Sequence, residues 1–251
     1  QSLTEPSTFT QVHFAKCEPV VMDTRFNSSV TDIFRNEYLS PRSPYTTLQI
    51  PKQGIGEWCH PLHTVDINDA GLRSSVQNGI LNTELGIPFR TPAEGHNVAF
   101  TSLWDNYPDS LEIPLKGKAS RAYLLMAGST NHMQCHIDNG VIRIYYKDGT
   151  RDVMFLRNPD NWPPIEHIFF EDGLAFNRHT PALYRLRLKK GEISNNFGEE
   201  LGFPGASREL DGGAAVLLEM PLNPGKKLSH LVLETLSNDV VIGLMSITLQ
   251  R

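Results

Sequence analysis

Cysteine is scarce in this chain: Cys17, Cys59 and Cys135 are its only three. Three scattered cysteines cannot build a disulfide scaffold, and no two of them have the spacing of a metal-binding pair, so we expect buried free thiols. Long apolar runs are also missing. No stretch approaches the roughly 20 residues that span a bilayer, and we therefore expect no membrane span.

Positive charge is in deficit, because 23 Lys and Arg residues face 28 Asp and Glu residues for a formal net charge of −5. No basic stripe is present to meet a phosphate backbone, so we expect no nucleic-acid partner. The chain contains no glycine-rich phosphate loop and neither the G-x-S-x-G nor the H-E-x-x-H motif. Nucleotide-dependent enzymes and the common hydrolases thus lack support, and we expect no cofactor and no catalytic motif.

Three segments partly imitate metal sites. Residues 66–71 begin like a calcium loop, but Ala70 stands where an oxygen ligand belongs and Gln77 where a bidentate glutamate belongs. An Asx-type turn is the expected structure there. Residues 59–63 and 132–136 each combine a cysteine with two histidines, but their spacing sets no common face. We expect ordered loops in all three segments and no metal.

The residue pattern has a period of two, which is typical of strands. In the segment 183–190, apolar side chains alternate with Arg185, Arg187 and Lys189, which indicates a half-buried strand with a solvated basic face. The run 123–127 is apolar throughout, so we expect a strand that is covered on both faces. Further strands are expected at 214–220, 228–236 and 240–249.

A hairpin is expected at Asp148-Gly149, because Asp-Gly suits a two-residue type I′ loop. That loop would pair Lys147 with Thr150 and place Ile144 opposite Val153. The four residues expected to face the core are Ile142, Ile144, Val153 and Phe155.

Helix is expected only in short pieces. Ser29 is a suitable N-cap for a helix over 29–38, which Ser40-Pro41 would end. Repeats and linkers are not evident. The pattern therefore predicts an all-β, antiparallel β-sandwich with one or two short helices, as a single domain over 1–251 in which 1–85 supply N-terminal strands and loops.

The three tryptophans, Trp58, Trp104 and Trp162, all lie in polar, turn-rich segments. Sugars have flat apolar faces rimmed by hydroxyls, so a sugar site combines aromatic platforms with polar side chains. We expect Trp104 and Trp162 to be such platforms and Trp58 to be a weaker third. The alternative is that each ring pins its loop onto the sandwich. The polar partners expected at the same rim are Asn131, Asp160, Asn161 and Glu166.

Several segments resemble a known family. These are 100–119, 123–131, 146–150, 158–166 and the tail 228–249, together with Gly86-Ile87-Pro88-Phe89, which is similar to the start of galactose-binding-like jelly rolls. The family is an uncharacterised Bacteroidetes domain of unknown function, found in large secreted proteins of polysaccharide-utilisation type. The resemblance covers residues 86–249 and extends weakly into the first 85.

The resemblance implies a jelly roll of galactose-binding-like type, a periplasmic or cell-surface location and glycan-related work. In that family the sandwich accompanies a glycoside-hydrolase-like catalytic domain. A chain of 251 residues is too short to hold both. The resemblance therefore implies that this chain is one domain of a longer protein.

Three functions remain open. The first is a non-catalytic domain that binds a poly- or oligosaccharide or docks against a catalytic domain of the same longer chain. The second is a glycoside hydrolase that uses loop carboxylates such as Glu166. The third is a structural module that supports a neighbouring domain.

Overall fold

The computed structural model describes residues 16–39, 65–130, 134–168, 177–196 and 209–251. Helix is confined to the 3₁₀ turns η2 (Asp23–Arg25) and η3 (Val30–Asp32) and to the short α1 (Ala70–Ser74) in this part of the chain. The strands are β1 (Cys17–Pro19), β2 (Ile80–Asn82), β3 (Pro88–Arg90), β4 (Ala99–Ser102), β5 (Ser110–Pro114), β6 (Arg121–Met126), β7 (Ser129–Thr130), β8 (Asp138–Tyr146), β9 (Arg151–Arg157), β10 (Arg185–Arg187), β11 (Glu192–Ser194), β12 (Ala214–Pro221), β13 (Leu228–Thr235) and β14 (Val240–Gln250).

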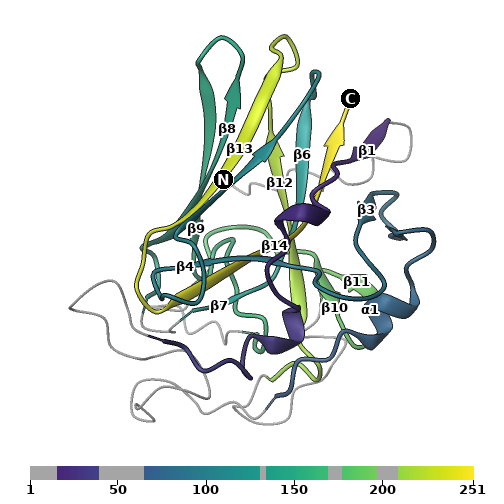
Figure 1. Cartoon of the computed structure of the whole chain (residues 1–251), viewed down its shortest axis with the longest axis vertical. Coiled ribbons are helices and arrows are strands. Elements are labelled where there is room, and N and C mark those ends of the chain that lie inside the picture. The colour runs from purple at the N-terminus through teal and green to yellow at the C-terminus, as the bar shows by residue number, and fades with distance from the viewer. Residues whose placement is uncertain (1–15, 40–64, 131–133, 169–176, 197–208) are drawn as a thin grey trace.

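The strands form two antiparallel layers (Figure 1). The larger sheet has the order β1-β14-β6-β12-β10-β11, and β4 and β7 also pair with β14. The smaller sheet has the order β5-β13-β8-β9, and β2 and β3 form a separate hairpin. The expected all-β antiparallel sandwich is therefore confirmed. Among the described helices, none is long and apolar enough to cross a membrane.

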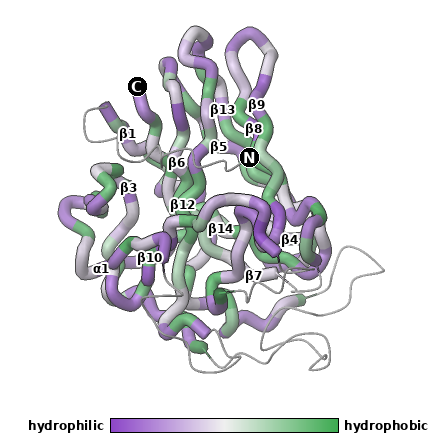
Figure 2. Tube along the Cα trace, turned by 180° about the vertical axis from the view of Figure 1, so that it is seen from behind, coloured by the Kyte–Doolittle hydropathy of each residue, from purple (hydrophilic) through white to green (hydrophobic). Residues whose placement is uncertain are grey.

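The larger sheet is covered on both faces, which explains why its central strands are apolar throughout. On β6, Leu124 and Met126 belong to the core between the two sheets, whereas Tyr123 and Leu125 belong to a second core on the opposite face. Hydrophobic residues follow β12 and β14 through the middle of the molecule (Figure 2). The expected strands at 123–127, 214–220, 228–236 and 240–249 are all present.

The expected hairpin register is wrong by one residue. Tyr146 donates its N–H to the carbonyl of Thr150 at 2.9 Å, so the loop holds three residues, with Gly149 at φ +84°. Three-residue loops that end in a left-handed glycine are the next most common hairpin class after two-residue loops. Ile144 consequently lies opposite Asp152, and Val153 and Phe155 point outward.

This register makes a prediction for stability. Leu156 is fully buried, whereas the neighbouring Phe155 is 42% exposed. Leu156→Ala should therefore lower the free energy of unfolding by about 2–5 kcal/mol. Phe155→Ala, the matched control, should change it by less than about 1 kcal/mol. Urea unfolding of both variants measures the difference. A larger loss of stability for Phe155→Ala would contradict the observed register and support the two-residue loop.

The expected helix over 29–38 is reduced to the 3₁₀ turn η3. Asn97 Oδ1 accepts the N–H of Val30, a first-turn group that has no partner within a helix, at 2.9 Å. The carbonyl of Ile33, which a continuing α-helix would pair with the N–H of Glu37, accepts the Tyr38 hydroxyl at 2.8 Å instead.

The prediction that the basic side chains of the 183–190 strand are solvated is wrong for Arg185. Arg185 is buried and donates to the carbonyls of Pro164, His167 and Ala214 at 2.6–2.9 Å.

Candidate functional site

The structure buries both tryptophans that it describes. Trp104 is 3% exposed, and its Nε1 donates to the carbonyl of Asn238 at 3.1 Å. Trp162 is 0% exposed and packs so closely on Gly128 that a Cβ there would lie 2.7 Å from the ring. Neither ring presents a face to a sugar, so both fit the alternative role of holding a loop on the sandwich.

The two rings are also separated by the larger sheet. Trp162 belongs to the core between the sheets, and Trp104 belongs to the core on the other face. They therefore do not meet at one rim. Trp58 and Asn131 lie outside the described residues.

Asn161 serves the backbone instead of a ligand. Its side-chain amide donates to the carbonyl of Phe155 at 2.9 Å and accepts the N–H of Arg157 at 2.8 Å, which holds the loop after β9. Its neighbour Asp160 contacts two histidines, His136 and His179.

Glu166 is fully buried, not part of a solvent-facing loop. The hydroxyl of Ser129 donates to both of its carboxyl oxygens at 3.2 and 3.3 Å. Loss of hydration in this interior raises the pKa of Glu166 to about 7, although Ser129 and the positive charge of Arg185 act in the opposite direction. The same loss of hydration lowers the pKa of Arg185 to about 10. In this position Glu166 cannot reach a substrate.

Aromatic side chains do occur on the outer face of the smaller sheet, but other side chains already stack on them. The ring of Tyr145 lies between His230, whose ring is 4.7 Å away and nearly parallel, and the guanidinium of Arg151 at 5.8 Å. The guanidinium of Arg157 lies over the ring of Phe155 at 5.5 Å. A sugar would have to displace the His230 ring or the guanidinium groups, so this face is a poor platform.

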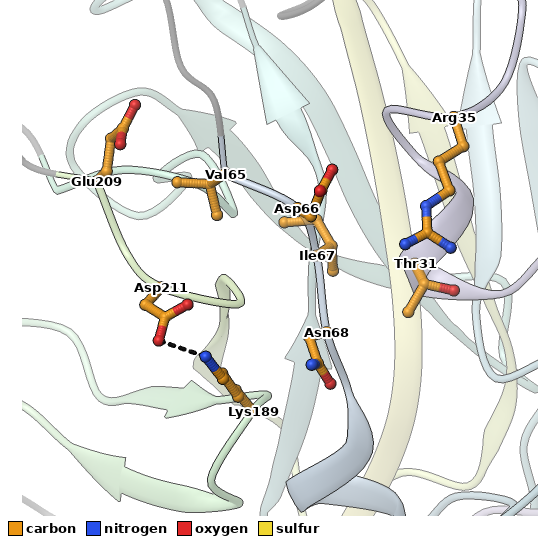
Figure 3. A pocket seen from close by; sticks show the side chains of 9 residues that line it. All are labelled: Thr31, Arg35, Val65, Asp66, Ile67, Asn68, Lys189, Glu209 and Asp211. Carbon is orange, nitrogen blue, oxygen red and sulfur yellow. Dashed lines mark hydrogen bonds and ion pairs between the residues drawn. The ribbon is translucent and has the colours of Figure 1, made fainter.

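A cavity of about 740 Å³ offers a different site (Figure 3). The segment 65–68 runs between Thr31 and Arg35 on one side and Lys189 and residues 209–211 on the other. The nine side chains that line it come from Thr31, Arg35, Val65, Asp66, Ile67, Asn68, Lys189, Glu209 and Asp211.

The segment 65–68 gives the cavity a polar surface because its side chains alternate. Val65 and Ile67 are buried in the core beneath, whereas Asp66 and Asn68 are exposed. This is the pattern of an extended segment lying on an apolar layer. Asn68 Oδ1 accepts the N–H of Ala70 at 3.0 Å, which confirms the Asx-type turn expected at the start of α1.

Backbone hydrogen bonds hold the parts of the cavity together. Asn68 donates its N–H to the carbonyl of Gly212 at 3.0 Å, and Leu188 donates to that of Gly213 at 3.0 Å. Both glycines have left-handed backbones, and a Cβ on Gly213 would lie 2.7 Å from Ile67. Glycine is therefore required where these segments approach each other.

Among the described residues that line the cavity, positive and negative charges are nearly balanced. Asp66, Glu209 and Asp211 contribute three carboxylates, and Arg35 and Lys189 contribute two cations, which leaves one net negative charge. Lys189 Nζ and Asp211 Oδ2 form an exposed ion pair at 2.6 Å. Such a lining suits an uncharged ligand with many hydroxyls better than a polyanion or polycation.

The cavity residues are not among the binding residues expected from the sequence. Within the segment that resembles a calcium loop, Asp66 and Asn68 line the cavity, whereas Asp69 is buried and accepts hydrogen bonds from Arg73 and Asn97. In comparisons with known proteins, no family model, no curated protein and no solved structure matches the chain.

Proposed function

We propose that this chain is a non-catalytic, carbohydrate-binding β-sandwich whose ligand lies in the cavity around the segment 65–68. The observation that carries the proposal is the concentration of exposed or half-buried carboxylate, amide, hydroxyl and cationic groups around one concave surface. Sugar hydroxyls both donate and accept hydrogen bonds, so they can pair with all of these groups. The near-zero net charge favours a neutral glycan.

The recognition would rest on hydrogen bonds more than on stacking. Among the nine lining residues there is no aromatic ring. Each hydrogen bond contributes a modest net free energy, because it replaces a hydrogen bond to water. We therefore expect an oligosaccharide that spans the cavity to bind more tightly than a monosaccharide.

The resemblance of residues 86–249 to a polysaccharide-utilisation family is consistent with this proposal. It extends the proposal to a jelly roll of galactose-binding-like type, a periplasmic or cell-surface location and a catalytic domain elsewhere in a longer chain. In such a longer chain, the sandwich would hold a glycan close to the catalytic domain.

The proposal predicts the effect of two substitutions. Asp66→Ala and Arg35→Ala should each weaken oligosaccharide binding at least about tenfold, because a hydrogen bond to a charged group contributes about 1.5–3 kcal/mol. Both side chains are exposed, so the melting temperature should stay within about 1 °C of wild type. Isothermal titration against a panel of neutral plant and host oligosaccharides measures the affinity.

Glu94→Ala and Lys118→Ala are the matched controls, since both side chains are exposed and lie outside the cavity lining. They should bind as wild type does. Equal binding by all four variants would contradict the site. Release of reducing sugar above a heat-killed control would contradict the non-catalytic role and would instead support the glycoside-hydrolase alternative, with the cavity carboxylates as its acids.

A further inference from the structure

Two histidines and an aspartate meet at one end of the smaller sheet. His136 lies just before β8, Asp160 lies just after β9, and His179 comes from the segment that leads towards β10. One potential ligand atom from each of the three residues lies within 4.8 Å of the other two. Local sequence patterns do not predict this cluster, because its residues are up to 43 positions apart.

The separations of these atoms suit a bound ion. His136 Nδ1 lies 3.6 Å from Asp160 Oδ2, and His179 Nδ1 lies 3.5 Å from Asp160 Oδ1. Both distances are longer than a good hydrogen bond. Two ligand atoms that each lie about 2.1 Å from one tetrahedral zinc ion are themselves about 3.4 Å apart. Each histidine nitrogen therefore lies at nearly this spacing from one carboxylate oxygen of Asp160, and the three ligand atoms lie within 4.8 Å of one another.

The backbone holds the three residues in this arrangement. Asp160 Oδ1 also accepts the N–H of His179 at 2.8 Å, and its carbonyl accepts the hydroxyl of Thr180 at 2.6 Å. His136 has a left-handed backbone with φ 54°, and its N–H donates to the carbonyl of Asn158 at 2.7 Å. These hydrogen bonds place both imidazoles beside Asp160.

The donor types identify the class of ion. Two imidazoles and one carboxylate suit zinc and other divalent transition metals, whereas calcium and magnesium prefer a full set of oxygen ligands. The side chains of His136 and Asp160 are 29% and 17% exposed, and that of His179 is 63% exposed. The cluster is consequently open to solvent beside His179, which leaves room for water or a further ligand on the ion.

We propose that His136, Asp160 and His179 form a binding site for a divalent transition-metal ion, with zinc as its first candidate. The site is distinct from the proposed glycan cavity, since it shares no residue with the cavity lining. The two proposals can therefore fail separately.

Metal titration of the chelator-treated chain tests the site. We expect wild type to bind one equivalent of zinc that His179→Ala binds at least about tenfold more weakly. Cobalt(II) titration should show a visible absorption band in wild type that is lost in the same variant. Because the His179 side chain is mostly exposed, the variant should fold, and its melting temperature in chelator should match that of wild type.

His136→Ala provides a second variant at the same site, and His96→Ala, an exposed histidine outside the cluster, provides the control. The proposal requires that His136→Ala bind zinc more weakly than wild type and that His96→Ala bind zinc as wild type does. Absence of stoichiometric zinc binding by wild type would overturn it. So would equal affinity and stoichiometry in wild type, His179→Ala and His136→Ala, which would place any bound ion elsewhere on the chain.

Discussion

Replacing Trp162 with alanine should lower the free energy of unfolding by about 3–5 kcal/mol, the usual cost of removing a large buried aromatic side chain. The ring is fully buried in the core between the two sheets and lies against Gly128, where no side chain could fit beside it. The neighbouring Gly128 has no side chain that could move into the resulting cavity. Urea unfolding followed by far-ultraviolet circular dichroism measures the loss.

Trp162→Phe is the matched control. Trp162 Nε1 is buried and has no hydrogen-bond partner in the described part of the chain, so phenylalanine removes ring volume but breaks no hydrogen bond there. We expect a clearly smaller loss than for alanine. If Trp162→Ala instead unfolded like wild type but bound glycan less tightly, the ring would be a sugar platform after all, and the burial described here would be contradicted.

Replacing Glu166 with glutamine should change how stability depends on pH. Burial raises the pKa of Glu166 to about 7 in the folded chain, from its ordinary value of 4.5. Between these values the unfolded chain loses the proton while the folded chain keeps it, so rising pH favours unfolding. Wild-type stability from this group is thus fully present below about pH 4.5 and is lost as pH rises through 7.

Glutamine stays neutral at every pH and can still accept the hydroxyl hydrogen of Ser129. The stability of Glu166→Gln relative to wild type should therefore increase by about 3 kcal/mol between pH 4.5 and pH 8, since each pKa unit corresponds to about 1.4 kcal/mol. Chemical denaturation across that range measures the difference, with the exposed Glu94→Gln as control. A glutamine variant that is about 3–5 kcal/mol less stable at pH 8 would show that Glu166 is an ionised partner of Arg185.

Much of the sandwich could be predicted from the sequence, because its central strands carry an unambiguous apolar pattern. Tyr123–Ala127 has no polar residue, and the structure covers β6 on both faces. The long apolar run at the end of the chain likewise forms β14, which pairs with four other strands. In such segments burial and strand propensity favour the same conformation.

The hairpin register and the burial of the tryptophans could not be predicted from the sequence pattern alone. Asp148-Gly149 fits both a two-residue and a three-residue loop, and moving the pairing by one residue reverses the face of Val153 and Phe155. Trp104 and Trp162 lie in polar segments, but the sequence around them does not show which way the rings turn. In the structure both rings turn inward, where their large apolar surface is removed from water.

The cavity and the histidine cluster could not be predicted because tertiary structure creates them. The cavity brings together four side chains that are distant in sequence: Thr31, Asp66, Lys189 and Asp211. They meet only when η3, the segment before α1, the turn after β10 and the turn before β12 pack together. In the same way, the expected binding residue Asp160 does lie near polar partners, but these are His136 and His179. No local pattern records such long-range neighbours.

The central claim, that the cavity around residues 65–68 binds a glycan, is tested most directly by a crystal structure of the chain with the oligosaccharide that binds it best. We predict sugar density in contact with Asp66 and Arg35 and no sugar beside Trp104 or Trp162. Density at another surface, such as the outer face of the smaller sheet around Tyr145, would contradict the claim.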